Sequence, residues 1–374
     1  MRRPALPRFF LAAIGAAPLA LGQTGPPAGS TPGPVTERIG VSLVEVPVSV
    51  LDSSGAPVPG LQARDFHIFD DGRPVEIEAL DIEEYSAPVH ARAGRAAAPA
   101  SRARASVARR FLVLFDQSFI TGAELVRARD AARHFVREQM GMDDLAAVGV
   151  VSTKAASILQ NFTRDRGALD LAIGKVSIPA DTFRKTVIVG DATSGSRRGK
   201  YTGAELDRIE QAGRARDAGK MTDLLSGLDA ISRWLGSVPG RKQVVYLSHG
   251  FDVMTDESWL LTPLSRVVEE MRRDDAIVHT VDLAGIRPAG EGGMAGASQN
   301  LLSDMAQETG GQFLTSSNDF SAQLGQILRA TSVVYVLSFR PAPGGTPGRR
   351  HRLEVRVDRP GARVSARTAY LEPA

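Results

Sequence analysis

The sequence predicts an α/β fold, in which helices cover both faces of a mostly parallel β-sheet. From about residue 109, short apolar runs alternate with segments of helical spacing. Several runs, such as FLVLFD at 111–116 and QVVYLS at 243–248, are apolar throughout, which is typical of strands buried on both faces. Strands that alternate with helices need crossover connections, and these make neighbouring strands parallel. The predicted α/β domain spans 109–340.

Within that domain the apolar periodicity places each element in turn. Predicted strands lie at 111–116, 145–152, 243–248, 276–282 and 311–316, and predicted helices lie near 125–136, 168–176, 221–236, 260–273, 299–309 and 320–330. A polar, basic and glycine-rich stretch at about 184–220, with one helix-compatible piece at about 204–214, interrupts this rhythm. We therefore interpret it as an insertion.

Segments of β patterning flank the α/β domain on both sides. Alternating valines at 41–52 and two short runs around Asp71-Gly72 predict an N-terminal β unit at 37–88. Alternating runs around a Pro/Gly loop predict a C-terminal hairpin or meander at 341–374. Because the two ends have similar alternation, we hypothesise that they pair into a small β-sandwich.

The first residues have the composition of a secretory signal peptide. Residues 1–22 have a basic start, an apolar stretch and small residues at Ala20 and Gly22. Residues 23–36 are rich in Pro, Gly, Ser and Thr and predict a flexible spacer. We expect a secreted or periplasmic protein that does not span the membrane after cleavage, with an uncleaved signal-anchor as the alternative.

Composition excludes several kinds of chemistry. There are no cysteines among the 374 residues, which excludes disulfides, thiolate catalysis and cysteine-ligated zinc. Without the three arginines of residues 1–22, the chain has 42 basic and 42 acidic residues. The arginine-rich run at 91–110 lacks interleaved aromatic residues, so we interpret 89–108 as an Ala/Arg-rich solvated linker. No nucleic-acid partner is expected.

Four sequence motifs occur in an order that resembles von Willebrand factor A (VWA) domains. They are a strand that ends in Asp-x-Ser at 116–118, GRKQVVYLSHGF at 240–251, IVHTVDLAG at 277–285 and ETGGQF at 308–313. The segments at 48–77 and 335–357 resemble those that flank the A-like domain in VWA-related proteins of the acidobacterial type. The resemblance implies a Rossmann-like VWA fold and a role in protein recognition.

The resemblance also implies a metal-ion adhesion site, of which this sequence keeps only part. Asp116 and Ser118 match the first two positions of the family's Asp-x-Ser-x-Ser motif, and Thr222 matches its later Thr. Ile120 stands where the second Ser belongs, and His249 stands where the family has an Asp. A hard cation such as Mg²⁺ or Mn²⁺ prefers oxygen ligands. We therefore expect recognition that requires no cofactor or depends only weakly on a divalent cation.

The same residues allow other interpretations. Asp116 and Ser118 could cap the helix that follows them, and Thr222 could cap its own. His249, with Asp252 close in sequence, could line the binding rim or favour a transition metal.

The motifs of common enzymes are missing. The sequence contains no G-x-S-x-G nucleophile elbow and no H-E-x-x-H zinc helix. We expect a binding protein with an unidentified protein partner, not an enzyme. The alternatives are an exported metal-dependent hydrolase that uses Asp116, His249 and Asp252, and a structural component of the cell envelope.

Overall fold

The computed structural model describes residues 43–85, 108–178, 203–250, 258–286, 292–342 and 345–372. The chain divides into two compact units, Met1–Val41 and Ser42–Ala374. The first unit lies outside the described residues, and with it the predicted signal peptide and spacer. Nearly all of the predicted linker at 89–108 also lies outside them.

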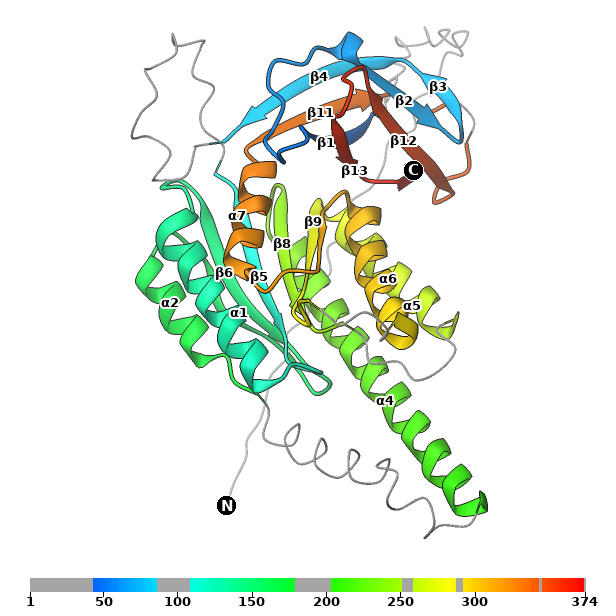
Figure 1. Ribbon diagram of the computed structural model, residues 1–374. Coiled ribbons are helices and arrows are strands. Elements are labelled where there is room, and N and C mark those ends of the chain that lie inside the picture. The colour runs from blue at the N-terminus through cyan, green and yellow to red at the C-terminus, as the bar shows by residue number, and fades with distance from the viewer. Residues whose placement is uncertain are drawn as a thin grey trace, which may run out of the picture. The chain divides into compact units, whose positions relative to one another are not determined.

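A six-stranded sheet forms the centre of the α/β domain (Figure 1), with strand order β10-β9-β8-β5-β6-β7. Its strands are β5 (Arg110–Asp116), β6 (Leu145–Val151), β7 (Ala156–Thr163), β8 (Lys242–Ser248), β9 (Ala276–Asp282) and β10 (Phe313–Leu314). All neighbours are parallel except β6 and β7. Numbered along the chain, this is the 3-2-1-4-5-6 order of doubly wound folds, so the predicted fold class is confirmed.

Strand β7 is the element that the sequence does not predict. It pairs antiparallel with β6 at the edge of the sheet, with register shifts along the pair. Most of its residues are only partly buried. An edge strand with a half-exposed face lacks the continuous apolar run that marks the central strands, so periodicity alone does not separate it from a loop.

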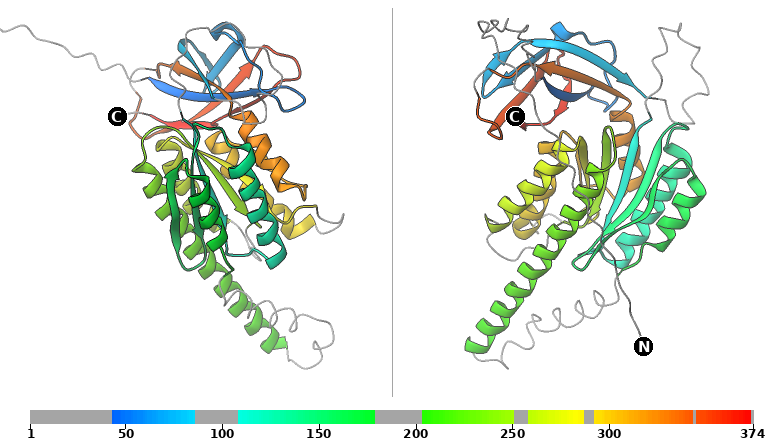
Figure 2. Two further views of the ribbon diagram at one scale, coloured as in Figure 1. Left: turned by 90° about the vertical axis from the view of Figure 1, so that its left-hand side faces the viewer. Right: turned by 180° about the vertical axis from the view of Figure 1, so that it is seen from behind.

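Helices cover both faces of the sheet, as Figure 2 shows from two further directions. They are α1 (Gly122–His134), which continues into a π-helical turn at Phe135–Gln139, α2 (Arg166–Lys175), α4 (Gly203–Gly236), α5 (Ser258–Arg273), α6 (Gly292–Thr309) and α7 (Phe320–Ala330). Among the described residues, no helix is both long and apolar enough to cross a membrane.

Alternate residues of β5 reach the two opposite hydrophobic layers. Phe111, Val113 and Phe115 pack with buried residues of α1, α2 and α7. Leu112 and Leu114 pack with buried residues of α4, α5 and α6. Successive side chains of a strand point to opposite faces, which explains why this central strand is apolar throughout.

Helix α4 differs from the prediction at its start. The segment expected to belong to an insertion at 184–220 contains the first half of this 34-residue helix, from Gly203 onward. The predicted helix start near Met221 lies in its middle, although its predicted end near Gly236 agrees. The helix-compatible piece at about 204–214 belongs to this helix, but the polar first half supplies no apolar stripe that would join it to the helix predicted from Met221.

The flanking β segments form two four-stranded sheets, ordered β13-β1-β11-β4 and β14-β12-β2-β3. Their strands are β1 (Val44–Leu51), β2 (Phe66–Asp70), β3 (Arg73–Val75), β4 (Ile77–Glu84), β11 (Val333–Phe339), β12 (Arg350–Val357), β13 (Arg363–Ala366) and β14 (Ala369–Leu371). N-terminal and C-terminal strands pair directly, β1 with β11 and β13, and β2 with β12. Both sheets contribute to one hydrophobic core.

The pairing of β11 corrects the predicted boundary of the α/β domain. The prediction ends that domain at residue 340, whereas β11 lies between β1 and β4 in a sandwich sheet. Only Thr331 and Ser332 separate it from α7. Its sequence, VVYVLSF, is almost wholly apolar, and a central sandwich strand and a buried parallel strand share this pattern. Local sequence therefore cannot assign the strand to either domain.

A buried ion pair holds the start of β5. Arg109 donates through Nε and Nη2 to the two carboxylate oxygens of Asp144, at 2.9 and 2.7 Å. Its Nη1 donates to the carbonyl of Leu328 in α7, at 3.0 Å. Both side chains of the pair are at most 2% exposed. This bidentate guanidinium therefore links the residue before β5 to Asp144 and to α7.

We predict that Asp144→Asn lowers the free energy of unfolding by about 3–5 kcal/mol, because it removes the charge of the buried carboxylate that pairs with Arg109. Chemical denaturation of both proteins measures the difference. The control is Glu354→Gln, whose ion pair with Arg356 is exposed and should contribute less than about 1 kcal/mol. Equal losses of unfolding free energy in the two variants would contradict a stabilising role of the buried Arg109–Asp144 pair.

Candidate functional site

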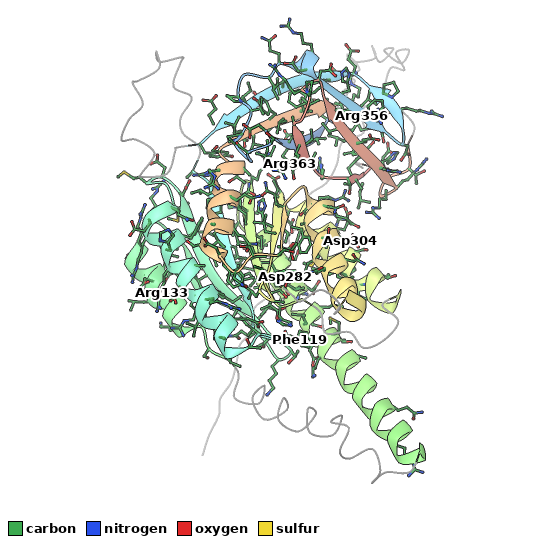
Figure 3. The ribbon with its side chains drawn as sticks, viewed as in Figure 1. Phe119, Arg133, Asp282, Asp304, Arg356 and Arg363 are labelled. Atoms are coloured by element: carbon green, nitrogen blue, oxygen red, sulfur yellow. The ribbon has the colours of Figure 1, made fainter. Side chains whose placement is uncertain are left out.

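The site predicted from the sequence lies at the carboxyl ends of the parallel strands. Strand order reverses between β5 and β8, and ligands of doubly wound folds bind at this switch point. The last residues of three neighbouring strands are Asp116 in β5, Ser248 in β8 and Asp282 in β9. Figure 3 shows Phe119 and Asp282 at this edge of the sheet, which we call the carboxyl-end rim.

The carboxylate of Asp116 is buried, and both of its oxygens accept hydrogen bonds from the protein itself. Its Oδ2 accepts hydrogen bonds from the Tyr246 hydroxyl at 2.6 Å and the Ser248 hydroxyl at 2.8 Å. Its Oδ1 accepts the backbone N–H of Ser118 at 2.9 Å. Burial raises the pKa of Asp116, and these hydrogen bonds oppose the rise. Burial and the adjacent carboxylate also raise the pKa of Tyr246.

This arrangement leaves Asp116 poorly placed to bind a cation. Both oxygens already accept donors, and the side chain is only 1% exposed. Ile120, which replaces the second Ser of the family motif, belongs to the hydrophobic core under α1. A cation at Oδ2 would have to displace the Tyr246 or the Ser248 hydroxyl from a buried carboxylate, at the desolvation cost of the displaced group.

Thr222 does not cap a helix. It lies within α4, is exposed, and its hydroxyl donates to the carbonyl of Ala218 one turn earlier, at 3.0 Å. The expectation that it caps its helix is wrong because that helix begins at Gly203. Its neighbour Lys220 does reach the rim, with its ammonium 5.9 Å from the centre of the Phe119 ring.

The helix after β5 is capped by residues that the sequence analysis did not name. Thr121 is the N-cap of α1, and Glu124 completes a capping box with it. Asp116 accepts only the amide of Ser118 within the loop. The expectation that Asp116 and Ser118 cap α1 is therefore wrong. The T-x-x-E pattern at 121–124 is the signal that would have identified the cap.

His249 pairs with Glu124 at the rim. Its Nδ1 lies 3.0 Å from Glu124 Oε1, and its side chain is 35% exposed. Burial tends to raise the pKa of Glu124, but His249 and the Thr121 amide hold it below its usual value. The structure therefore brings Asp116, Ser118 and His249 to one edge. Asp252 lies outside the described residues.

The rim contains a third acidic residue that the sequence analysis quoted but did not select. Asp282 Oδ2 accepts hydrogen bonds from Gln299 at 2.9 Å and Thr315 at 3.2 Å, and Oδ1 accepts the Ala284 amide at 3.0 Å. Its position as the last residue of a predicted strand is the signal that could have identified it. Like Asp116, it is buried and held by donors of its own chain.

One group of three potential metal ligands occurs among the described residues, and it lies away from the rim. Ligand atoms of Asp70, Asp71 and His351 are all within 4.8 Å of one another, in the β-sandwich. The sequence predicts no functional role for these residues. The adjacent acids are visible in the sequence, but their proximity to His351 depends on the pairing of β2 with β12.

No family model matches the sequence, and no curated protein matches it. Among solved structures, the chain is similar to the SpRpn10 VWA domain, at 12% identity and a TM-score of 0.30 over 59% of this chain and 94% of that one. It is also similar to the TFIIH p34 N-terminal domain, at 10% identity and a TM-score of 0.31 over 59% and 97%. The class of the domain, a doubly wound α/β fold, follows from its own strand order.

We predict that Asp116→Asn removes a pH-dependent cost of folding. A raised pKa means that the folded protein binds this proton more tightly than the unfolded chain, whose value is near 3.8. The stability contributed by the group is therefore present at low pH and is lost as pH rises toward the folded pKa, by up to ~1.4 kcal/mol per pH unit.

Denaturant unfolding of both proteins from pH 4 to pH 8 measures this effect. The variant should gain stability relative to the natural protein as pH rises. Parallel curves over the whole range would show that the carboxyl of Asp116 has the same pKa in both states.

Proposed function

We propose that this chain is an exported protein-recognition module that binds its partner through the carboxyl-end rim without a metal ion at Asp116. The observation that carries the proposal is the closed hydrogen-bond set of Asp116, both of whose oxygens accept donors of the chain. A partner carboxylate therefore has no cation at this position to bind. Recognition then depends on the side chains that the rim exposes.

The rim offers apolar and charged groups suited to a protein surface. Ile286 follows β9 and is 65% exposed, and its amide donates to Asn318 at 3.4 Å. Phe119 is half-buried beneath Lys220. The Glu124–His249 pair adds charge beside them. Apolar anchors surrounded by polar groups are typical of the centres of protein interfaces.

The geometry favours binding over hydrolysis. Ser248 is fully buried, and its hydroxyl donates to Asp116. A hydroxyl held in this way is not exposed to a substrate, and the Asp116 carboxylate that accepts its hydrogen bond is buried as well. His249 contacts the carboxylate of Glu124. These contacts support a structural part for both residues in the rim, so we propose that the chain is not an enzyme.

The proposal also covers the location of the protein and the family to which it belongs. The basic and apolar composition of residues 1–22 supports secretion or delivery to the periplasm. The β units on both sides of the α/β domain support membership of the acidobacterial type of VWA-related proteins.

We predict that Ile286→Asp lowers partner capture at least about tenfold, because it places an unpaired charge at an apolar contact. Pull-down from envelope extracts, with and without chelator, measures capture. The control is Leu171→Asp, which changes an equally exposed residue of α2. Undiminished capture by Ile286→Asp would overturn the assignment of the rim, and loss of capture with chelator would overturn metal independence.

We also predict that the chain is cleaved on export. When the full sequence is produced in a bacterium, N-terminal sequencing of the exported protein should begin just after Gly22. A protein retained with its first 22 residues intact would instead support a signal-anchor.

A further inference from the structure

We propose that Asp70, Asp71 and His351 form a binding site for a divalent transition-metal ion in the β-sandwich. Asp70 is the last residue of β2, Asp71 begins the turn to β3, and His351 lies in β12. The proposal is independent of the recognition function assigned to the carboxyl-end rim.

Two of the three separations among the ligand atoms match those of atoms that share one ion, and all three lie within 4.8 Å. His351 Nδ1 lies 3.2 Å from Asp70 Oδ1 and 3.2 Å from Asp71 Oδ2. Nitrogen and oxygen ligands lie about 2.1 Å from Zn²⁺, so two ligands at an angle of about 100° are roughly 3.2 Å apart. The two observed distances fit one central position.

Two of these atoms are buried without any hydrogen-bond partner. They are Asp70 Oδ1 and His351 Nδ1. The Asp70 residue is 8% exposed. Buried polar atoms are almost always hydrogen-bonded, and each exception requires an explanation. A cation between the two atoms would satisfy both.

The other polar atom of each ligand is held by a neighbour. The Tyr370 hydroxyl donates to Asp70 Oδ2 at 2.8 Å, and the Arg352 amide donates to Asp71 Oδ1 at 2.9 Å. His351 Nε2 lies 2.7 Å from Glu372 Oε2. If Nε2 donates this bond, Nδ1 is left as an acceptor. Metal-bound histidines are typically oriented by such a carboxylate.

The turn fixes the position of Asp71. Asp71 and Gly72 both have positive φ, 47° and 80°, as the two central residues of a type I′ hairpin turn require. Arg349 also contacts Asp71, with Nη2 3.3 Å from Oδ2. That guanidinium is 61% exposed, so it can move into solvent when a cation binds.

The chemistry of the ligands selects the class of ion. An imidazole nitrogen with two carboxylate oxygens suits Zn²⁺, Mn²⁺ or Fe²⁺, whereas Mg²⁺ and Ca²⁺ prefer oxygen alone. The ligands come from strands near both ends of the chain, on either side of the α/β domain. An ion bound only by the folded protein would stabilise the pairing of these strands.

The test is calorimetric titration of the full chain with Zn²⁺ and with Mg²⁺ after chelator treatment. We expect one equivalent of Zn²⁺ at micromolar affinity or tighter, a higher melting temperature with Zn²⁺, and no comparable binding of Mg²⁺. Less than one equivalent of Zn²⁺, or equal binding of both ions, would overturn the proposal.

Variants locate the ion. Asp70→Asn and His351→Gln should weaken Zn²⁺ binding at least tenfold, and Glu372→Gln should weaken it about tenfold through the orientation of His351. The matched control is His67→Gln on β2, an exposed histidine paired with Asp358, which should bind as the natural protein does. Unchanged binding by Asp70→Asn would overturn the site.

A measurement on the natural protein avoids variants that fail to fold. Zn²⁺ should shift the NMR resonances of the His351 imidazole and leave those of His67 unchanged. Zn²⁺ binding that leaves the His351 resonances in place would show that the ion binds elsewhere and would overturn the proposal.

Discussion

The direct pairing of strands from the two ends of the chain is the constraint on which the rest of the structure depends. Strand β11 lies between β1 and β4, and β12 pairs with β2. The sandwich core can therefore form only when residues on both sides of the α/β domain come together. Such pairing between distant segments costs loop-closure entropy before the stabilising contacts form.

The buried Arg109–Asp144 pair fixes the chain at the start of β5, where it enters the α/β sheet.

Inside the α/β domain, the buried charge of Asp116 determines what the rim can do. A carboxylate out of contact with water needs hydrogen-bond donors, and Tyr246, Ser248 and the Ser118 amide supply them. The Tyr246 and Ser248 hydroxyls occupy Oδ2, one of the two oxygens through which a metal would bind. The carboxyl-end rim thus lies where doubly wound folds bind ligands. The carboxylate of Asp116 is stabilised there by hydrogen-bond donors of its own chain.

The metal-ligand cluster in the β-sandwich also contains buried carboxylates, but it has fewer hydrogen-bond donors around them. At Asp70, Asp71 and His351, neighbouring groups hold one polar atom of each side chain. The remaining atoms of Asp70 and His351 are buried without a hydrogen-bond partner. What distinguishes the two places is the number of donors around each carboxylate. Both oxygens of Asp116 accept donors, whereas Asp70 Oδ1 has no donor, and a cation can complete its coordination.

Periodicity in the sequence alone determined the α/β class, the central strands, most helices and the Asp71-Gly72 turn, because these depend on local spacing and backbone preference. The sequence also placed Asp116, Ser118 and His249 at one edge, since strand ends converge in a parallel sheet. Only the tertiary structure decided the sheet of β11, the partners of Asp116 and the approach of His351 to Asp70. Each of these depends on contacts between residues distant in sequence, which no local pattern encodes.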